Sequence, residues 1–340
     1  MVLGLHGLHH QRERTSMHGD EFPESGGRTA AAWPRSAAVI GAAGLIGSGV
    51  SERLAENSQA GDLYMIDLNE NLVRAHAIDI AETQVIAGNT RTRLHPRRPE
   101  DGTAVDLVVL AASIPEVPDG DRRDFLAANL RLLGTLTPMI RSLAGDSGIV
   151  MILSNPVDIL ADCLAQTSGI DPARICGYSL NDTVRFRMAV AKELGADVGD
   201  VGGLMLGEHG GHQVPLFEAL TVKGAPVRLD AGQQARVMED VNGWFARWSA
   251  LKPGRSTGWA TPAGVSRIVQ AMADGSVHPA AIWTGGLEDM PETFIALPAV
   301  LEAGRFAARP DLLPAGARDG LRAAATSVAE AARAALAAIR

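Results

Sequence analysis

Between residues 35 and 153 the hydrophobic positions follow two alternating patterns. Short, nearly unbroken apolar runs predict strands that are covered on both faces, and apolar residues at helical spacing predict helices between them. The predicted strands cover residues 37–40, 63–66, 105–112 and 148–153, and the predicted helices cover 46–54, 71–87 and 122–144. Because strands that alternate with helices indicate a parallel sheet, we expect a doubly wound α/β Rossmann domain over residues 35–178.

The pattern changes after residue 178. There the spacing predicts helices at 182–194, 230–249 and 262–274, and strand-like pieces at 201–206 and 219–222. The chain closes with an alanine-rich helical segment, whose apolar face comprises Leu321, Val328, Ala332, Leu336 and Ile339. We expect this face to pack on the body of the protein. Residues 179–340 are therefore predicted to form a second, α+β domain.

Residues 1–34 show no such periodicity. They are rich in His, Gly, Glu and Arg, which predicts a disordered N-terminal extension. His6, His9 and His10 could hold a metal, but we favour a solvated tail. The start has no basic segment followed by a sufficient apolar core, so we expect no signal peptide.

Composition narrows the function classes. The net charge is -8 over 340 residues, whereas a protein that binds nucleic acid or an anionic membrane would carry a basic stripe. No run of 18 apolar residues occurs, so no membrane-spanning helix is predicted. Cys163 and Cys176 form neither a CxxC pair nor a disulfide framework, which favours a reducing compartment. We therefore expect a cytoplasmic globular protein without nucleic-acid or membrane partners.

A glycine-rich turn directly follows the first predicted strand and opens a helix. The helix dipole and the first amides of such a helix favour a pyrophosphate. Asp67 closes the next strand, where a carboxylate can accept hydrogen bonds from both hydroxyls of an adenosine ribose and would repel a 2′-phosphate. The pattern predicts NAD, although glycines that serve packing and an aspartate that caps a helix would look the same. The predicted cofactor residues here are Gly41, Gly44, Leu45, Ile46, Gly47 and Asp67.

Four polar segments further along need a joint explanation: 114–124, 154–158, 181–187 and 207–210. Reduction of a 2-oxo acid needs a cation for the carboxylate, a donor that polarises the carbonyl and an acid that supplies a proton. Arg185 can hold a carboxylate bidentately, and Arg122, in a loop rich in Pro, Gly and Asp, can fold over a substrate. His209 suits proton exchange near neutral pH if a buried Asp182 fixes its tautomer. A surface ion pair and a turn histidine would explain single features, but not all of them in this order.

In these motifs the sequence resembles the lactate/malate dehydrogenase family, over roughly residues 36–340. The resemblance implies a Rossmann fold, NAD as cofactor and a 2-oxo/2-hydroxy acid as substrate, with residues 179–340 as the substrate-binding and catalytic domain. The implied catalytic residues are His209, Asp182 and Arg122. The implied substrate-binding residues are Arg185, Asn155, Arg122 and Thr257. Further implied cofactor contacts are Asn129, Ser154 and Asn155. Members of the family are usually oligomeric, which implies a homodimer or homotetramer.

One loop position departs from the family pattern. Six residues before the mobile arginine, malate enzymes carry arginine and lactate enzymes usually glutamine, whereas this chain carries Glu116. An ionised Glu116 that faces the pocket would repel the second carboxylate of oxaloacetate. We therefore expect a substrate other than malate, with a hydrogen-bond donor or a cation at its distal end that Glu116 receives. Alternatively, Glu116 points to solvent or pairs with Arg123, and the enzyme uses malate or lactate.

Two other function classes remain open. A non-catalytic NAD-binding homologue would keep the fold, but the presence of Arg122, Asp182, Arg185 and His209 together argues against it. Glycoside hydrolases that use NAD and a metal have a related scaffold, but they need a cysteine and a histidine that hold the metal. No histidine lies near Cys176 in the sequence. The interpretation we favour is an NAD-dependent dehydrogenase without a metal.

Overall fold

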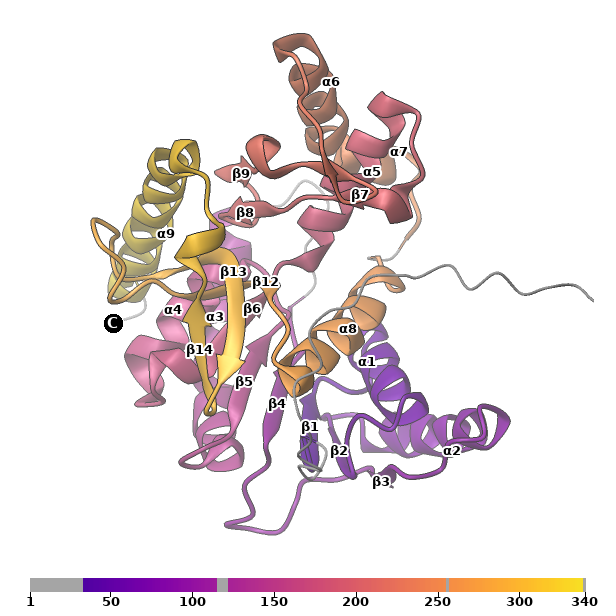
Figure 1. The fold of residues 1–340 in the computed structure, drawn as a ribbon. Coiled ribbons are helices and arrows are strands. Elements are labelled where there is room, and N and C mark those ends of the chain that lie inside the picture. Colours follow the sequence, from indigo (N-terminus) through magenta and orange to yellow (C-terminus); the bar gives the residue numbers. More distant parts are fainter. Residues whose placement is uncertain (1–32, 115–121, 255–256, 339–340) are drawn as a thin grey trace, which may run out of the picture. The chain divides into compact units, whose positions relative to one another are not determined.

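The first six strands run parallel and form one part of a large mixed sheet (Figure 1). Their order is β3-β2-β1-β4-β5-β6, which is the order of a doubly wound dinucleotide-binding fold. The strands are β1 (Ser36–Ile40), β2 (Asp62–Ile66), β3 (Arg93–His95), β4 (Leu107–Leu110), β5 (Ile149–Ile152) and β6 (Ile175–Tyr178). The predicted α/β architecture of this half is confirmed, and β3 and β6 are strands that the periodicity did not reveal.

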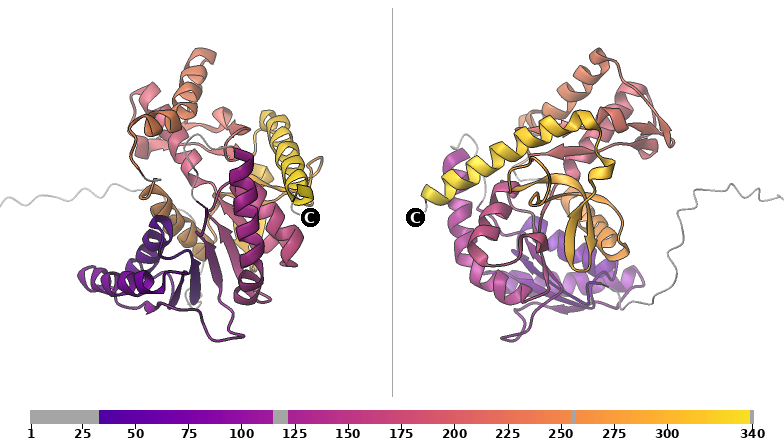
Figure 2. Two further views of the ribbon diagram at one scale, coloured as in Figure 1. Left: turned by 180° about the vertical axis from the view of Figure 1, so that it is seen from behind. Right: turned by 60° about the vertical axis from the view of Figure 1, so that its left-hand side comes forward.

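Three of the four helices that connect these strands begin and end close to the predicted positions, whereas the last was not predicted. In chain order the four are α1 (Leu45–Glu56), α2 (Glu70–Ile86), α3 (Arg122–Ala144) and α4 (Val157–Ser168). Asn69 starts α2 because its side chain accepts a hydrogen bond from the amide of Leu72 at 3.2 Å. Helix α1 packs with α2 and α8, and α3 packs with α4 and α9, as Figures 1 and 2 show from different sides.

The second half of the chain continues the same sheet. Strand β12 pairs antiparallel with β6, and β13 then pairs with β12, β8 and β14. These strands are β8 (Met205–Gly207), β9 (Gln213–Pro215), β12 (His278–Trp283), β13 (Phe294–Glu302) and β14 (Arg305–Ala308). The mixture of antiparallel strands and helices fits the predicted α+β character. The sheet itself is continuous across residue 178, where the sequence predicts a domain boundary.

The strand-like piece predicted at 201–206 is wrong as a single strand. Residues Val201–Gly202 (β7) pair with β10 (Thr221–Val222) in a separate small sheet, which β11 (Ala225–Pro226) completes. Strand β8 instead joins the large sheet through β13. The local apolar pattern does not distinguish these two sheets, because the pairings of β7 with β10 and of β8 with β13 join segments that are separated in the sequence.

The helices of the second half are α5 (Leu180–Leu194), α6 (Ala231–Asn242), α7 (Trp244–Ala250), α8 (Ala260–Asp274) and α9 (Arg318–Ala338). The single helix predicted at 230–249 is divided into α6 and α7 by Gly243. Glycine lowers helix stability, and the guanidinium of Arg247 donates to the carbonyl of Asp240 at 2.8 Å. The carbonyl of Asp240, which would otherwise accept a hydrogen bond within the helix, thus accepts one from a side chain at the break.

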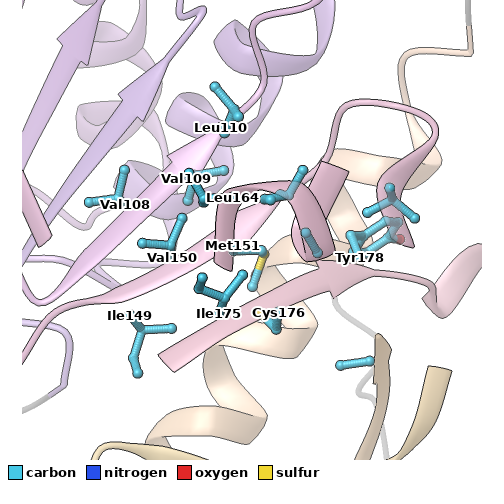
Figure 3. Packing of buried hydrophobic residues seen from close by; sticks show 14 of the residues in the cluster. Val108, Val109, Leu110, Ile149, Val150, Met151, Leu164, Ile175, Cys176 and Tyr178 are labelled. Carbon is cyan, nitrogen blue, oxygen red and sulfur yellow. The ribbon is translucent and has the colours of Figure 1, made fainter. Parts of the chain in front are cut away.

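The core lies between the sheet and its helices, and Figure 3 shows the part around the central strands. All side chains of β4 and β5 are buried. The labelled residues that pack there are Val108, Val109, Leu110, Ile149, Val150, Met151, Leu164, Ile175, Cys176 and Tyr178. Burial of one large aliphatic side chain contributes about 1.5–3 kcal/mol, so these layers hold the carboxyl ends of the parallel strands in fixed positions.

The structure describes residues 33–114, 122–254 and 257–338, with the backbone alone at residues 122 and 123. Most of the predicted extension, including His6, His9 and His10, lies outside these ranges, and so does Glu116. None of the helices within them combines the length and apolar composition that a bilayer crossing requires.

Both cysteines are buried free thiols. Burial raises the pKa of Cys163 to about 12, and it also raises the pKa of Cys176. Neither thiol is therefore poised to act as a nucleophile near neutral pH.

Candidate active site

The glycine-rich turn lies at the carboxyl end of β1, against the segment that follows β4. A Cβ atom on Gly41 would lie 2.4 Å from the amide nitrogen of Ala112, and Gly41 has a φ of +93°, which favours glycine. A Cβ on Gly47 would lie 2.1 Å from the carbonyl oxygen of Gly41. At Gly44 the nearest atom would be 3.4 Å away. Gly41 and Gly47 are thus required for the close packing of the turn, and Gly44 leaves the outer surface of the turn without a side chain.

This surface fits a pyrophosphate. Helix α1 starts at Leu45 after an extended Gly44, so the first amides of the helix have no side-chain cap. The first turn of a helix leaves amides without an intrahelical acceptor, and the helix dipole favours an anion there. Leu45 is 39% exposed beside this turn. The amides of Leu45, Ile46 and Gly47 would therefore hold the phosphates of NAD.

Asp67 lies directly after β2 and is hydrogen-bonded to the glycine turn. One of its carboxylate oxygens accepts a hydrogen bond from the amide of Ala43 at 3.1 Å, and the other accepts from Asn69 at 3.0 Å. Each oxygen keeps a lone pair for a further donor, because a carboxylate oxygen can accept two hydrogen bonds. The two hydroxyls of an adenosine ribose are donors of that kind, so Asp67 fits the adenosine end of NAD.

Asn129, in α3, and Ser154, just after β5, are buried and already form hydrogen bonds. The Asn129 side chain accepts from the amide of Ile114 at 3.0 Å and donates to the carbonyl of Phe125 at 3.1 Å. The Ser154 hydroxyl donates to the carbonyl of Ala112 at 2.7 Å. Both side chains thus form hydrogen bonds to the segment after β4, which contacts the glycine turn.

His209 and Asp182 form the closest polar contact of the site. Nδ1 of His209 lies 2.5 Å from a carboxylate oxygen of Asp182, which is almost fully buried in the first turn of α5. His209 follows β8 in a tight turn, which Gly207 permits through its φ of +84°. Nε2 of His209 has no hydrogen-bond partner among the described residues, and the side chain is 24% exposed. The ring therefore presents Nε2 to the open side.

The electrostatics favour a protonated imidazole. Burial lowers the pKa of His209, but the charge of Asp182, its hydrogen bond to Nδ1 and the charge of Asp158 together outweigh burial. The net effect raises the pKa above the ordinary value of 6.5. Such an imidazole can donate and accept a proton within the physiological pH range.

Arg185 lies one helical turn after Asp182. Its Nη1 is 3.6 Å from the other oxygen of Asp182, and Trp244 of α7 covers one face of its guanidinium, with Cζ 3.8 Å from the ring centroid. This cation–π contact and the partly buried position restrain the planar group. The separation from Asp182 exceeds a hydrogen bond, so donors of Arg185 are left for an anion.

The remaining predicted residues are only partly placed. Asn155 is exposed after β5, at the same sheet edge as the glycine turn, and Thr257 is partly buried just before α8. Arg122 begins α3, but its side chain is not described, and Glu116 lies outside the described residues. The described contacts therefore unite His209, Asp182 and Arg185 directly.

Sequence reasoning missed three contributors. Trp244 was one aromatic residue in a predicted helix, and Asp158 was part of a quoted motif without an assigned role. Asn181 was missed too: it accepts from the Tyr178 hydroxyl at 2.8 Å and donates to Thr261 at 3.0 Å. Asp158 and Asn181 both lie in motifs that the sequence analysis singles out, whereas no local pattern connects Trp244 with Arg185.

Known proteins share this arrangement of elements. The family model described as lactate/malate dehydrogenase, NAD binding domain, matches residues 36–177. The malate dehydrogenase of Salinibacter ruber is 30% identical over 78% of this chain and 85% of its own length. The chain belongs to the lactate/malate dehydrogenase family. It is thus an NAD-dependent oxidoreductase that acts on the CH–OH group of a 2-hydroxy acid.

Further members of the lactate/malate dehydrogenase family also match this chain. The L-lactate dehydrogenase of Halalkalibacterium halodurans is 27% identical over 77% of this chain and 85% of that protein. A solved structure of the malate dehydrogenase from Salinibacter ruber has a TM-score of 0.76 and 27% identity, and the match covers 90% of this chain and 98% of that one. Relatives with both names lie at similar distances, so similarity alone does not choose the substrate.

Replacement of Asp67 by alanine is expected to weaken NADH binding by about ten- to a hundredfold, since hydrogen bonds to a charged group contribute about 1.5–3 kcal/mol. The preference for NADH over NADPH should narrow as well, because the charge that repels a 2′-phosphate is removed. Fluorescence titration with both cofactors measures the two effects. Unchanged affinity for NADH in D67A would contradict the assignment of Asp67 to the ribose.

Proposed function

We propose that this enzyme interconverts a 2-oxo acid and its 2-hydroxy acid, with His209 as the residue that exchanges the proton. The observation that carries the proposal is the contact of one buried carboxylate, Asp182, with both Nδ1 of His209 and, at longer range, Arg185. Asp182 thereby restrains both the ring that would exchange the proton, His209, and the cation that would bind the carboxylate, Arg185.

Asp182 orients the imidazole and stabilises its protonated form. Because Asp182 binds Nδ1, Nε2 is the atom that exchanges the proton with the substrate oxygen. Reduction needs the protonated ring, and oxidation needs the neutral ring. The raised pKa of His209 therefore favours reduction up to a higher pH than an unperturbed histidine would.

Arg185 binds the substrate carboxylate through the edge of its guanidinium. Trp244 covers one face, so a ligand approaches in the plane of the group, where two parallel N–H donors match a carboxylate. This orientation would direct the C2 oxygen of the substrate toward His209. We assign Arg122 to polarising the C2 carbonyl, and Asn155 and Thr257 to further substrate contacts.

NAD would be held by the amides after Gly44 and by Asp67, and it supplies or accepts the hydride at C2 of the substrate when bound. The chain's own task is to hold the carboxylate, exchange the proton at Nε2 of His209 and exclude water. By family membership we also propose a homodimer or homotetramer, which light scattering coupled to size-exclusion chromatography would measure.

For the substrate itself, we propose a 2-oxo acid whose distal end carries a hydrogen-bond donor or a cation, and not oxaloacetate. The support is the charge of Glu116 at the position where malate enzymes of the family carry arginine. A dianion next to a desolvated carboxylate is disfavoured, whereas a donor or cation is favoured. The competing proposal turns Glu116 away from the pocket and leaves malate or lactate as substrate.

A screen of 2-oxo acids, followed by NADH absorbance, tests this choice. We expect the best substrate to carry a distal hydroxyl, amine or guanidinium, and E116R to gain activity on oxaloacetate by about tenfold or more. E116Q should raise the activity on pyruvate. E100Q is a matched control, since Glu100 is an exposed acid in another loop.

Oxaloacetate or pyruvate as the best substrate by far would overturn the assignment of Glu116 to the pocket. So would an E116R variant with the same substrate profile as E100Q.

A further inference from the structure

A second buried carboxyl group contacts His209, through the backbone amide of that residue. Asp158 lies in the first turn of α4 and is 2% exposed. Its Oδ2 accepts a hydrogen bond from the backbone amide of His209 at 2.7 Å, across 51 residues of sequence. Its Oδ1 is buried without a hydrogen-bond partner among the described residues.

This position is unusual for an acidic residue at a helix start. Acids in the first turn commonly bind the free amides of their own helix or favour its dipole. At α4 the preceding residue is Pro156, no side chain caps the helix, and the carboxylate of Asp158 is instead directed to the turn after β8. An unsatisfied buried carboxylate oxygen is costly, so it needs an explanation.

The charged groups around Asp158 supply that explanation. Helix α5 contributes Asp182, and the turn contributes Glu208 and His209, while Arg185 of α5 acts on His209. Glu208 in turn is paired with His212, whose Nδ1 lies 2.7 Å from it. Burial raises the pKa of Asp158 to about 7, while the charge and the amide of His209 oppose that effect. His209 is therefore the group that most favours an ionised Asp158, and the attraction is mutual.

We propose that Asp158 is a positioning residue of this dehydrogenase, which fixes the main chain at His209 and stabilises the protonated imidazole from a second side. The inference depends on the proposed proton-exchange role of His209. The acid–base group of the site then comprises His209 and two carboxyl groups, Asp182 on its ring and Asp158 on its backbone amide, in place of a single histidine–aspartate pair.

D158N tests the charge of Asp158 separately from its shape. Asparagine is nearly isosteric and can still accept the amide of His209, so the turn should keep its position. With one negative charge removed, the midpoint of His209 protonation should move down by about half a pH unit to one unit. A purely structural role would lower the rates without moving this midpoint.

The midpoint can be measured without catalysis. Diethyl pyrocarbonate modifies neutral imidazole, and peptide mass spectrometry reports its rate at His209 as a function of pH in the enzyme without substrate. The pH profile of kcat/KM for reduction should move in the same direction. D158S, which is smaller and also uncharged, gives the same test if D158N does not fold.

D162N is the matched control. Asp162 is a buried acid one turn later in α4, and it binds Gln166 and Thr293 instead of His209. An unchanged His209 midpoint in D158N, or an equal shift in D162N, would overturn the proposal. Full turnover in H209N would instead refute the proposed function, and the modification midpoint would still decide whether Asp158 acts on His209.

Discussion

H209N is expected to lose about 10²–10⁴-fold in turnover while it still binds NADH. Asparagine occupies a similar volume and can keep a hydrogen bond to Asp182, but it does not exchange a proton near neutral pH. The proposed cofactor contacts at Gly44 and Asp67 belong to other elements, so they should be unaffected. Steady-state rates with NADH and fluorescence titration of NADH binding separate the two effects.

H212N provides the control for this substitution. His212 lies in the same turn, but its Nδ1 contacts Glu208 and its side chain is 53% exposed. We expect H212N to retain turnover within a fewfold of the parent. Equal losses in both variants would indicate that the turn is merely disturbed, and near-normal turnover in H209N would exclude His209 as the proton exchanger.

R185K is the second substitution with a large expected effect, a fall in kcat/KM of about 30- to 1,000-fold. This corresponds to about 2–4 kcal/mol, the range for losing one partner of a buried charged contact. Lysine keeps the charge but has no planar pair of donors for a carboxylate, and it loses the stacking on Trp244. Substrate saturation curves should show the loss mainly in KM.

R187K controls for an arginine-to-lysine change in the same helix. Arg187 is partly buried, and its Nε donates to the carbonyl of Gly203 at 2.8 Å, away from Asp182. We expect R187K to lower the thermal midpoint of unfolding with little change in KM. If R185K raised KM no more than R187K does, Arg185 would not be the residue that binds the substrate carboxylate.

Local signals predicted the parts of the site that one segment builds by itself. The glycine turn and Asp67 could be found because a tight turn, a helix start and a strand end each have requirements within a few residues. The bounds of α3 were predicted as 122–144 and are confirmed, because its apolar face repeats over many turns. The pairing of β12 with β6 was not predicted, since register between distant strands leaves no local pattern.

By itself the sequence determined the doubly wound fold, the NAD-dependent class and the residue types of the chemistry. Only the tertiary structure decided which groups surround them: Trp244 on the face of Arg185, Asp158 on the amide of His209, and Asn129 engaged by the backbone. The physical reason is that pKa values and donor geometry depend on burial and on charges that lie a few ångströms away. Those neighbours come from α4, α5, α7 and the turn after β8, which only folding brings together.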